Sequence, residues 1–346
     1  MRAARRAPSS RPLAFRAIVS SRRVFASALL ACAFVAGGCG GDDGEDGASK
    51  APPEARPDQF PRAEGRTLAQ LRRDLPDGGP VLAPTVSHFV TGDNRFGFGL
   101  FTTSRAQIAD ARAAVYVAPV GGGQALGPFV AHYQSLEVKS QFQSETTLQD
   151  PDAAKTLYVA EVPFRKPGNY EVLGMARLDD RLVAATSAAP HYVVVGSKED
   201  SVPAPGDEPP PIHTPTQADV AGNLASIDTR LPPSETQHDA DFADVLGEKP
   251  IVLTFATPRL CQSRVCGPVV DIAEQVQADY GDRAEFIHME IFKNNDVAQG
   301  YRPQVAAFRL PSEPWVFTID KSGKVAARME GAFSAAELER AIKQAL

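Results

Sequence analysis

The apolar residues of this chain change their spacing near residue 200, and this change constrains the fold more than any other feature. Before it, apolar residues form short runs separated by turns rich in Gly, Asn and Asp, as is typical of β-strands. After residue 236, strand-like runs alternate with segments whose apolar side chains recur at helical spacing. Between the two patterns, residues 197–216 contain six prolines and cannot build a core. The sequence therefore predicts two modules, 80–196 and 236–346, joined by a proline-rich linker over 197–235.

The first module is expected to be an antiparallel β-sandwich, because at least seven runs of strand character occur in it without helical periodicity. The expected strands span residues 85–90, 95–101, 113–118, 156–164, 169–178, 181–186 and 191–195. The sequence Pro167-Gly168-Asn169-Tyr170, which leads into one of these strands, resembles a corner of immunoglobulin-like domains, so we expect an Ig-like sandwich. No catalytic constellation of residues is visible in this module.

The second module alternates strand and helix in the order β-α-β-α-β-β-α. The expected elements are a strand at 250–256, a helix at 266–280, a strand at 284–292, a helix at 296–308, a hairpin at 314–330 and a last helix from Ser334, which forms a capping box with Glu337. This order resembles the thioredoxin fold. Three segments make the resemblance specific: Val252–Thr257, Cys261–Pro268 and Glu313–Trp315. The fold class expected for the whole chain is multidomain, with an N-terminal antiparallel Ig-like β-sandwich and a C-terminal α/β thioredoxin-like fold.

The thioredoxin resemblance implies roles for three residues. Cys261 and Cys266 stand where the family carries its redox couple, and Pro314 stands where the family carries a cis-proline against the cysteines. The sequence departs from the family in two respects. Four residues rather than two separate the cysteines, and Thr254 replaces the acidic residue of the central strand. The resemblance implies dithiol–disulfide exchange, with Cys261 and Cys266 as catalytic residues and Pro314 as a substrate-binding residue.

The residues around the cysteine pair suit this chemistry. A thiolate is the species that attacks a disulfide, so the pKa of the thiol determines its reactivity. Cys266–Pro268 is expected to open a helix, since proline is tolerated in a first helical turn. Free N–H groups at that helix start, with Arg259 and Arg264 nearby, favour a sulfur anion. Alignments from the strand and from the helix disagree on which cysteine attacks; Cys261 is preferred because it lies further from the helix.

The first 38 residues are expected to be an export signal. An apolar run at 24–36 follows Arg22 and Arg23 and is too short to span a bilayer. The run ends in Ala36-Gly37-Gly38-Cys39, which resembles the lipobox of bacterial lipoproteins, and the arginine pair resembles a twin-arginine signal. The lipobox implies that Cys39 is lipidated and that residues 39–79 are a tether. The protein is then expected on the extracytoplasmic face of the cell membrane, held there by its lipid anchor.

The distribution of charge limits the class of partner. The first 38 residues hold seven arginines and no acid, which leaves 29 basic against 42 acidic groups in the rest of the chain. This acidic balance argues against nucleic-acid binding. Because disulfides persist outside the cytoplasm, the expected partners are exported proteins that carry thiols or disulfides. The sequence predicts neither a cofactor nor a bound metal.

Three other interpretations of the cysteine pair remain open. In the first, the chain is a non-enzymatic surface lipoprotein that acts as a binding module, and the pair is a structural disulfide. In the second, Thr257 and the spacing of the cysteines resemble peroxiredoxins and imply a thiol peroxidase. In the third, the chain resembles thioredoxin-fold copper chaperones, which use two loop cysteines and a distant histidine, for which His288 is the candidate. Burial of both sulfur atoms, together with the absence of a groove past Pro314, would favour the binding module.

Overall fold

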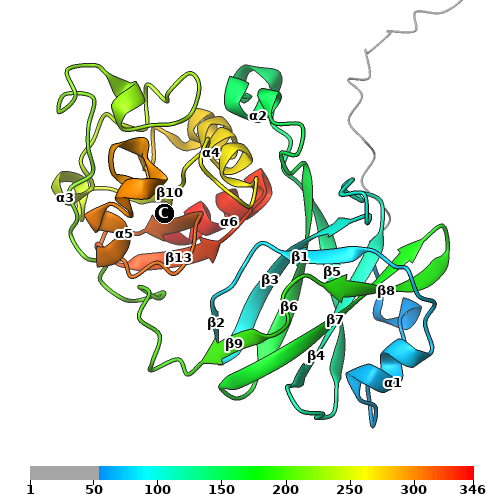
Figure 1. Cartoon of the computed structure of the whole chain (residues 1–346). Helices are drawn as coiled ribbons and strands as arrows, with labels where there is room; N and C mark the ends of the chain where they lie inside the picture. The colour runs from blue at the N-terminus through cyan, green and yellow to red at the C-terminus, as the bar shows by residue number, and fades with distance from the viewer. Residues whose placement is uncertain (1–53) are drawn as a thin grey trace, which may run out of the picture. The chain divides into compact units, whose positions relative to one another are not determined.

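A computed structural model of the chain describes residues 54–346 (Figure 1). The predicted export signal, its arginine pair, Cys39 and the first part of the tether lie outside the described residues. Within the described part, no helix combines the length and the apolar character that crossing a bilayer requires.

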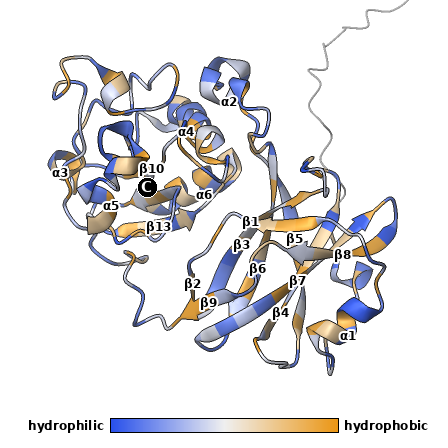
Figure 2. Cartoon of the chain, viewed as in Figure 1, coloured by the Kyte–Doolittle hydropathy of each residue, from blue (hydrophilic) through white to orange (hydrophobic). Residues whose placement is uncertain are grey.

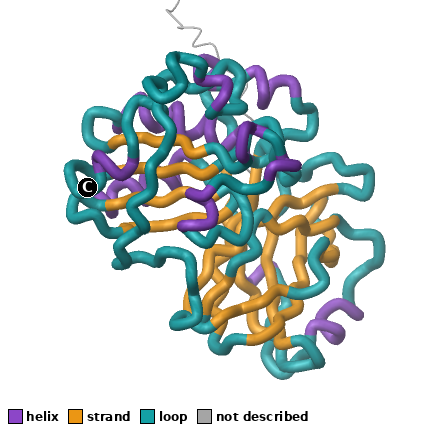
Figure 3. Tube along the Cα trace, turned by 60° about the vertical axis from the view of Figure 1, so that its left-hand side comes forward, coloured by secondary structure: helices purple, strands orange, loops and turns teal. Residues whose placement is uncertain are grey.

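The strands form two sheets, which Figure 3 shows as two sets of orange segments. The first sheet contains β1 (Val81–Pro84), β2 (Phe89–Val90), β3 (Gly92–Phe101), β4 (Arg112–Pro119), β5 (Leu126–Ser135), β6 (Thr156–Phe164), β7 (Gly168–Leu178), β8 (Arg181–Ser187) and β9 (Tyr192–Val195). Their order is β2-β9-β7-β4-β5-β6-β3-β1-β8, and β7 also pairs with β8. This additional pairing closes the seven strands from β7 to β8 into a barrel.

Closure of the barrel depends on the meeting of β1, β7 and β8. β1 is antiparallel to β3 but parallel to β8, so the barrel is mixed. Gly174 of β7 lies where the three strands meet. A Cβ atom on it would come within 2.7 Å of Leu82 Cδ1 in β1 and 2.9 Å of Ala185 Cβ in β8. Glycine at this position therefore lets β1 and β8 pack closely against β7.

The expected fold class, an Ig-like sandwich followed by an α/β thioredoxin-like fold, is wrong. The first module is a closed mixed barrel within a nine-stranded sheet, and the rest is a small second sheet with few helices. β1 and β5, which lie outside the expected strands, are both members of the closed ring. The predicted corner does exist, since the Tyr170 hydroxyl donates to the Lys166 carbonyl oxygen at 2.9 Å. Such a corner sets the path of one strand and does not determine whether the sheet closes.

β4 is buried on both faces, which explains its continuous apolar sequence. Its odd-numbered residues from 113 to 117 face the aromatic interior of the barrel. The even-numbered residues from 114 to 118 pack against α1 (Leu68–Arg73) and the chain before it. Tyr116 also donates from its hydroxyl to the Pro61 carbonyl oxygen at 2.6 Å. Part of the predicted tether therefore covers the outside of the barrel, where Figure 2 shows apolar residues along α1.

The second sheet has four strands in the order β11-β10-β12-β13. They are β10 (Ile251–Phe255), β11 (Glu285–Met289), β12 (Trp315–Ile319) and β13 (Val325–Glu330). β10 is parallel to β11 and antiparallel to β12. The longer helices are α4 (Cys266–Tyr280) and α6 (Ala335–Ala345). The shorter helical segments are α2 (Glu145–Gln149), α3 (Phe242–Val245), α5 (Pro303–Ala307), η1 (Pro57–Gln59), η2 (Ser140–Phe142), η3 (Leu224–Ser226), η4 (Lys293–Asn295) and η5 (Val297–Gln299).

Of the helices predicted in the second module, two are confirmed and one is largely wrong. The helix predicted at 266–280 is confirmed with the same bounds, and so is the capping box of Ser334 that opens α6. The helix predicted at 296–308 is wrong apart from its end, which forms α5. Gly300, within the predicted helix, has a left-handed backbone conformation (φ 74°), which a continuous right-handed helix does not allow.

The two faces of the second sheet belong to separate cores. Successive strand residues point to opposite faces. Val252 of β10 therefore packs with α4 and α6, whereas its neighbour Leu253 packs on the other face with Val305 of α5. The second of these cores also takes in Val202 and Ile212 from the predicted linker, so this part of the linker is packed on the sheet.

Residues of the barrel also contact the second sheet and its helices. Val159 of β6 belongs to the core that contains α4 and α6. Arg95 of β3 donates to both carboxylate oxygens of Glu337 in α6, at 2.7 and 2.9 Å, and to the Ala332 carbonyl oxygen at 2.7 Å. The barrel and α6 are thus joined by a largely buried, bidentate ion pair.

Candidate functional site

The two cysteines of the described part lie where β10 passes into α4. β10 ends at Phe255 and α4 begins at Cys266, so Cys261 lies in the loop between them. Both cysteines are free thiols. Cys261 keeps 9% of its surface exposed, whereas Cys266 is fully buried. A reagent that approaches from solvent therefore meets Cys261 first.

The surroundings of Cys261 favour its thiolate form. Hydrogen bonding with the Cys266 thiol, and further hydrogen bonds from Ser263 and from the N–H groups of Cys266 and Val265, lower the pKa of Cys261 to about 6, although burial opposes this shift. The Ser263 hydroxyl lies 3.2 Å from the sulfur. The N–H groups belong to the start of α4, where no side chain caps the helix. The sulfur thus accepts hydrogen bonds at a helix terminus that favours negative charge.

Cys266 has the opposite character. Burial raises the pKa of Cys266 well above its ordinary value, and interaction with Cys261 and the charge of Glu313 raise it further. Burial also raises the pKa of the Glu313 carboxyl group to about 7, with a second contribution from the charge of Cys261. Glu313 is therefore an acid beside the pair that can take up or release a proton near neutral pH.

Pro314 lies beside the start of the cysteine loop. Its peptide bond to Glu313 is cis, as the resemblance implied. Phe255, the last residue of β10, is the register partner of Trp315, so Pro314 is adjacent to the point where the loop leaves the sheet. Pro314 is buried, and its carbonyl oxygen accepts a hydrogen bond from the Gly331 N–H group at 2.8 Å.

A short helix from the first module covers the start of α4. This helix, α2, lies in the connection between β5 and β6. Ser144, at its N-terminus, donates from its backbone N–H and from its hydroxyl to Asp271 Oδ2 in α4, each at 3.1 Å. Gly267 follows Cys266, and a Cβ atom on it would come within 2.9 Å of Thr147 Oγ1. Glycine at this position lets α2 approach the buried cysteine.

A cavity of about 300 Å³ opens between α2 and the cysteine loop. Asp150 lines it on the side of α2, and Pro258, Arg259 and Arg264 line it on the side of the loop. Arg264 Nη1 lies 2.8 Å from Asp150 Oδ2, so an ion pair joins the two sides. The cavity is an open space next to the loop of Cys261.

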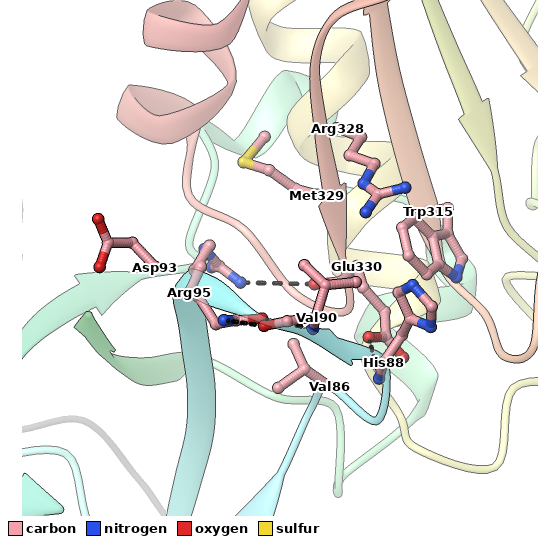
Figure 4. A pocket seen from close by; sticks show the side chains of 10 residues that line it. Val86, His88, Val90, Asp93, Arg95, Trp315, Arg328, Met329 and Glu330 are labelled. Atoms are coloured by element: carbon pink, nitrogen blue, oxygen red, sulfur yellow. Dashed lines mark hydrogen bonds between the residues drawn. The ribbon is translucent and has the colours of Figure 1, made fainter. Parts of the chain in front are cut away.

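A smaller cavity, of about 140 Å³, lies between the barrel and the second sheet (Figure 4). Neither cysteine lines it. Its Glu330 carboxylate accepts hydrogen bonds from the N–H groups of Ser87 and His88, at 2.9 and 2.8 Å. Its Arg328 pairs with Asp200. Because these charged groups are paired within the protein, we assign this cavity a structural role.

A separate group of buried ionisable residues consists of Asp228, His238 and His288, whose side-chain O and N atoms lie within 4.8 Å of one another. His288 Nε2 lies 3.1 Å from the Ala256 carbonyl oxygen. In the described part of the chain, neither cysteine belongs to this group. The copper-chaperone hypothesis therefore finds no site that joins His288 to the cysteines in residues 54–346.

Comparisons with known proteins identify no family. No protein-family model matches the chain, and no curated protein resembles its sequence. The solved structures that resemble it are thioredoxin-like thiol:disulfide proteins, at low structural similarity. One, described as a thiol:disulfide interchange protein DsbE from Chlorobium tepidum, is 19% identical, with a TM-score of 0.31 over 41% of this chain and 98% of its own. A thioredoxin-family thiol:disulfide interchange protein from Chlorobium tepidum TLS is 21% identical, with a TM-score of 0.27 over 42% and 95%.

Sequence reasoning missed two parts of this site. Thr254 replaces the family's acidic residue in the central strand, whereas Glu313, which the sequence analysis did not name as a site residue, lies close enough for its charge to act on Cys266. The signal for Glu313 was present, because it directly precedes Pro314, which the resemblance placed against the cysteines. α2 gave no comparable signal, since it is more than a hundred residues from Cys266 in sequence and contacts α4 only through tertiary packing.

Proposed function

We propose that this protein exchanges thiols and disulfides with exported proteins, with Cys261 as the attacking cysteine and Cys266 as the resolving one. The contrast between the two sulfurs carries the proposal. Cys261 has a pKa of about 6 and is the more exposed, whereas Cys266 is fully buried with a raised pKa. A disulfide-exchange enzyme needs one thiolate that attacks and one thiol that stays protected until a mixed disulfide has formed.

In the reducing direction, the Cys261 thiolate attacks one sulfur of a partner's disulfide. A mixed disulfide forms, and the partner's second sulfur leaves as a thiolate that takes up a proton. Cys266 then loses its proton to the Glu313 carboxylate and attacks the Cys261 sulfur. The partner leaves as a dithiol, the protein retains a Cys261–Cys266 disulfide, and two electrons have passed to the partner. The reverse sequence oxidises a partner dithiol.

The proposed location and the cavity together suggest the kind of partner. A lipid on Cys39 would hold the protein on the extracytoplasmic face of the cell membrane, where partner disulfides persist. The cavity between α2 and the cysteine loop has room for a segment of the partner chain. Arg264 is paired with Asp150 across the cavity, so it is the positive charge of Arg259 in the lining that favours a segment with acidic side chains.

The low exposure of the pair favours one competing function, a binding module with a structural disulfide. Cys266 has no exposed surface and Cys261 has 9%. The reduction potential of the pair separates the two functions. For exchange we expect a potential between about −120 and −270 mV, and a value below about −300 mV would indicate a structural disulfide. The measurement uses chain that begins after Cys39, equilibrated in glutathione buffers, alkylated and weighed by mass spectrometry.

The rate at which iodoacetamide alkylates Cys261 should rise with pH through a midpoint near 6, because only the thiolate reacts. Cys266→Ala removes the largest cause of the low pKa, so the midpoint should move up towards the ordinary value of 9.0. Cys261→Ala is the control, and its buried Cys266 should react slowly at every pH tested. A midpoint that stays near 6 in Cys266→Ala would show that the assigned cause is wrong.

A further inference from the structure

Asp228, His238 and His288 meet in the interior of the protein, and each has 1% of its surface exposed. Asp228 and His238 come from the irregular stretch between η3 and α3. His288 lies on β11, the edge strand of the second sheet. A buried carboxylate is costly unless a cation or hydrogen-bond donors compensate it. Backbone N–H groups already donate to the Asp228 carboxylate, and the two imidazoles beside it add potential metal ligands.

The distances between these side chains fit ligands around one ion. His238 Nε2 lies 3.3 Å from Asp228 Oδ2, and His288 Nδ1 lies 3.5 Å from Asp228 Oδ1. A strong charge-assisted hydrogen bond would be shorter, about 2.7–2.9 Å. In a tetrahedral zinc site with bonds of about 2.0–2.2 Å, neighbouring ligand atoms are about 3.3–3.6 Å apart. Both separations are longer than a strong charge-assisted hydrogen bond, and one candidate ligand atom from each residue lies within 4.8 Å of the others, so small side-chain movements would place all three around one ion.

The neighbouring groups orient the ligand atoms. The Ala256 carbonyl oxygen can only accept a hydrogen bond, so His288 Nε2 donates to it and His288 Nδ1 faces Asp228. His288 Nδ1 is buried and has no hydrogen-bond partner. Histidines that bind metals commonly donate their other N–H to a carbonyl oxygen in this way. The Asp228 carboxylate is itself fixed by the N–H groups of Arg230 and Ser234, at 2.7 and 2.8 Å.

From this geometry we propose that His238 Nε2, His288 Nδ1 and the Asp228 carboxylate bind one Zn²⁺ ion. Two imidazoles and a carboxylate are a donor set that suits zinc. All three residues are buried, and they leave the fourth position of a tetrahedral site to a water molecule. By binding Asp228 and His238 together with His288, the ion links the irregular segment between η3 and α3 to β11. Through the bond between His288 and Ala256 it also steadies the start of the cysteine loop.

Metal binding can be measured on chain that begins after Cys39 and carries no polyhistidine tag. The protein is stripped with a chelator, then titrated with Zn²⁺ in competition with a chromophoric chelator, and separately with Co²⁺ to record its visible spectrum. We expect one ion per chain and the spectrum of four-coordinate Co²⁺. His238→Ala and Asp228→Asn should each weaken zinc binding by at least about a hundredfold.

Two control variants should bind zinc as the wild type does. His213→Ala removes an exposed ring that pairs with Asp241 outside the cluster. The double variant Cys261→Ser/Cys266→Ser removes the thiols, so retained binding distinguishes this site from zinc held by the cysteines. The proposal is overturned if the wild type binds no stoichiometric zinc. It is also overturned if binding is lost in the double cysteine variant and kept in His238→Ala.

Thermal unfolding of the wild type gives a second measurement that does not depend on the variants folding. Free Zn²⁺ at a hundred times its dissociation constant should raise the unfolding temperature by about 5 °C. Mg²⁺ at the same concentration should not, because it prefers six oxygen ligands in octahedral geometry. An unfolding temperature that is unchanged by saturating zinc would show that the ion does not hold the segment to β11.

Discussion

Cys261→Ser should lower the rate of disulfide reduction by at least about a thousandfold. The variant loses the thiolate with a pKa of about 6, and the remaining Cys266 is fully buried with a raised pKa. A hydroxyl group cannot replace the thiolate, since it stays protonated at neutral pH. The rate is measured with insulin, a soluble disulfide-bonded protein, and dithiothreitol as the electron donor.

Cys266→Ser is the matched variant, because it also replaces a cysteine sulfur with oxygen, at the other cysteine of the pair. It keeps the Cys261 sulfur, so it should still attack a partner but should fail to release it. The expected product is a mixed disulfide that persists on a non-reducing gel and disappears when reductant is added. If Cys261→Ser traps a partner and Cys266→Ser does not, the roles of the two cysteines are the reverse of those proposed. If neither variant differs from the wild type in exchange, the pair is not the active couple.

Arg95→Ala should lower the free energy of unfolding by about 3–5 kcal/mol. Arg95 is the bidentate partner of Glu337, whose side chain is 6% exposed. Removing the guanidinium leaves this carboxylate buried without a cation, and it also removes the hydrogen bond to the Ala332 carbonyl oxygen. Urea unfolding followed by circular dichroism measures the loss. The control is Arg56→Ala, whose ion pair with Asp58 is exposed on both sides and whose loss should cost less than about 1 kcal/mol.

The effect of Arg95→Ala should also depend on pH. Burial opposes ionisation of Glu337, but the charge and hydrogen bonds of Arg95 lower the pKa of Glu337 below its ordinary value of 4.5. The stabilisation from the pair is therefore present above that ordinary value and is lost as the pH falls through the lower, folded value. The difference between wild type and variant should be full at pH 7 and shrink below about pH 4. A difference that stays constant down to pH 3 would show that Arg95 acts by packing alone.

Local patterns predicted the elements of the second module because their signals lie within single segments. The apolar face that includes Ile272 and Val276 predicted the helix that forms α4 with the same bounds. The helix expected at 296–308 is absent because the left-handed backbone at Gly300 interrupts it. In the first module, β6, a largely buried strand of nine residues, was also predicted with its observed bounds.

The closed barrel could not be predicted in the same way. Its ring depends on Val81 of β1 pairing with Thr186 of β8, and no local pattern encodes a contact between residues so far apart. The corner at Tyr170 was correctly located, yet it is compatible with open and closed sheets alike. Gly174 allows the close packing at the closure, but this role is visible only once Leu82 and Ala185 are known to be its neighbours.

In the candidate site too, some residues could be named from the sequence, whereas properties that arise from tertiary packing could not. Cys261, Cys266 and Pro314 could be named as candidates from the sequence, because the thioredoxin resemblance implies their roles. The difference between the two thiols could not be found, since it arises from burial and from hydrogen bonds at the start of α4. The cover provided by α2 is likewise a result of tertiary packing, whereas Glu313 could have been found from its place before Pro314.

The closure of the barrel has a consequence for folding kinetics. β1 pairs with β8, so the ring cannot close during synthesis until Ser187 has left the ribosome. Pairings between distant strands raise the contact order, and domains of this kind fold in milliseconds to seconds rather than microseconds. Until closure, β1 and β8 each present an unpaired edge, and exposed edges of nascent chains are prone to aggregation. The nascent chain therefore passes through a vulnerable interval whose length is set by the distance in sequence between its first and last barrel strands.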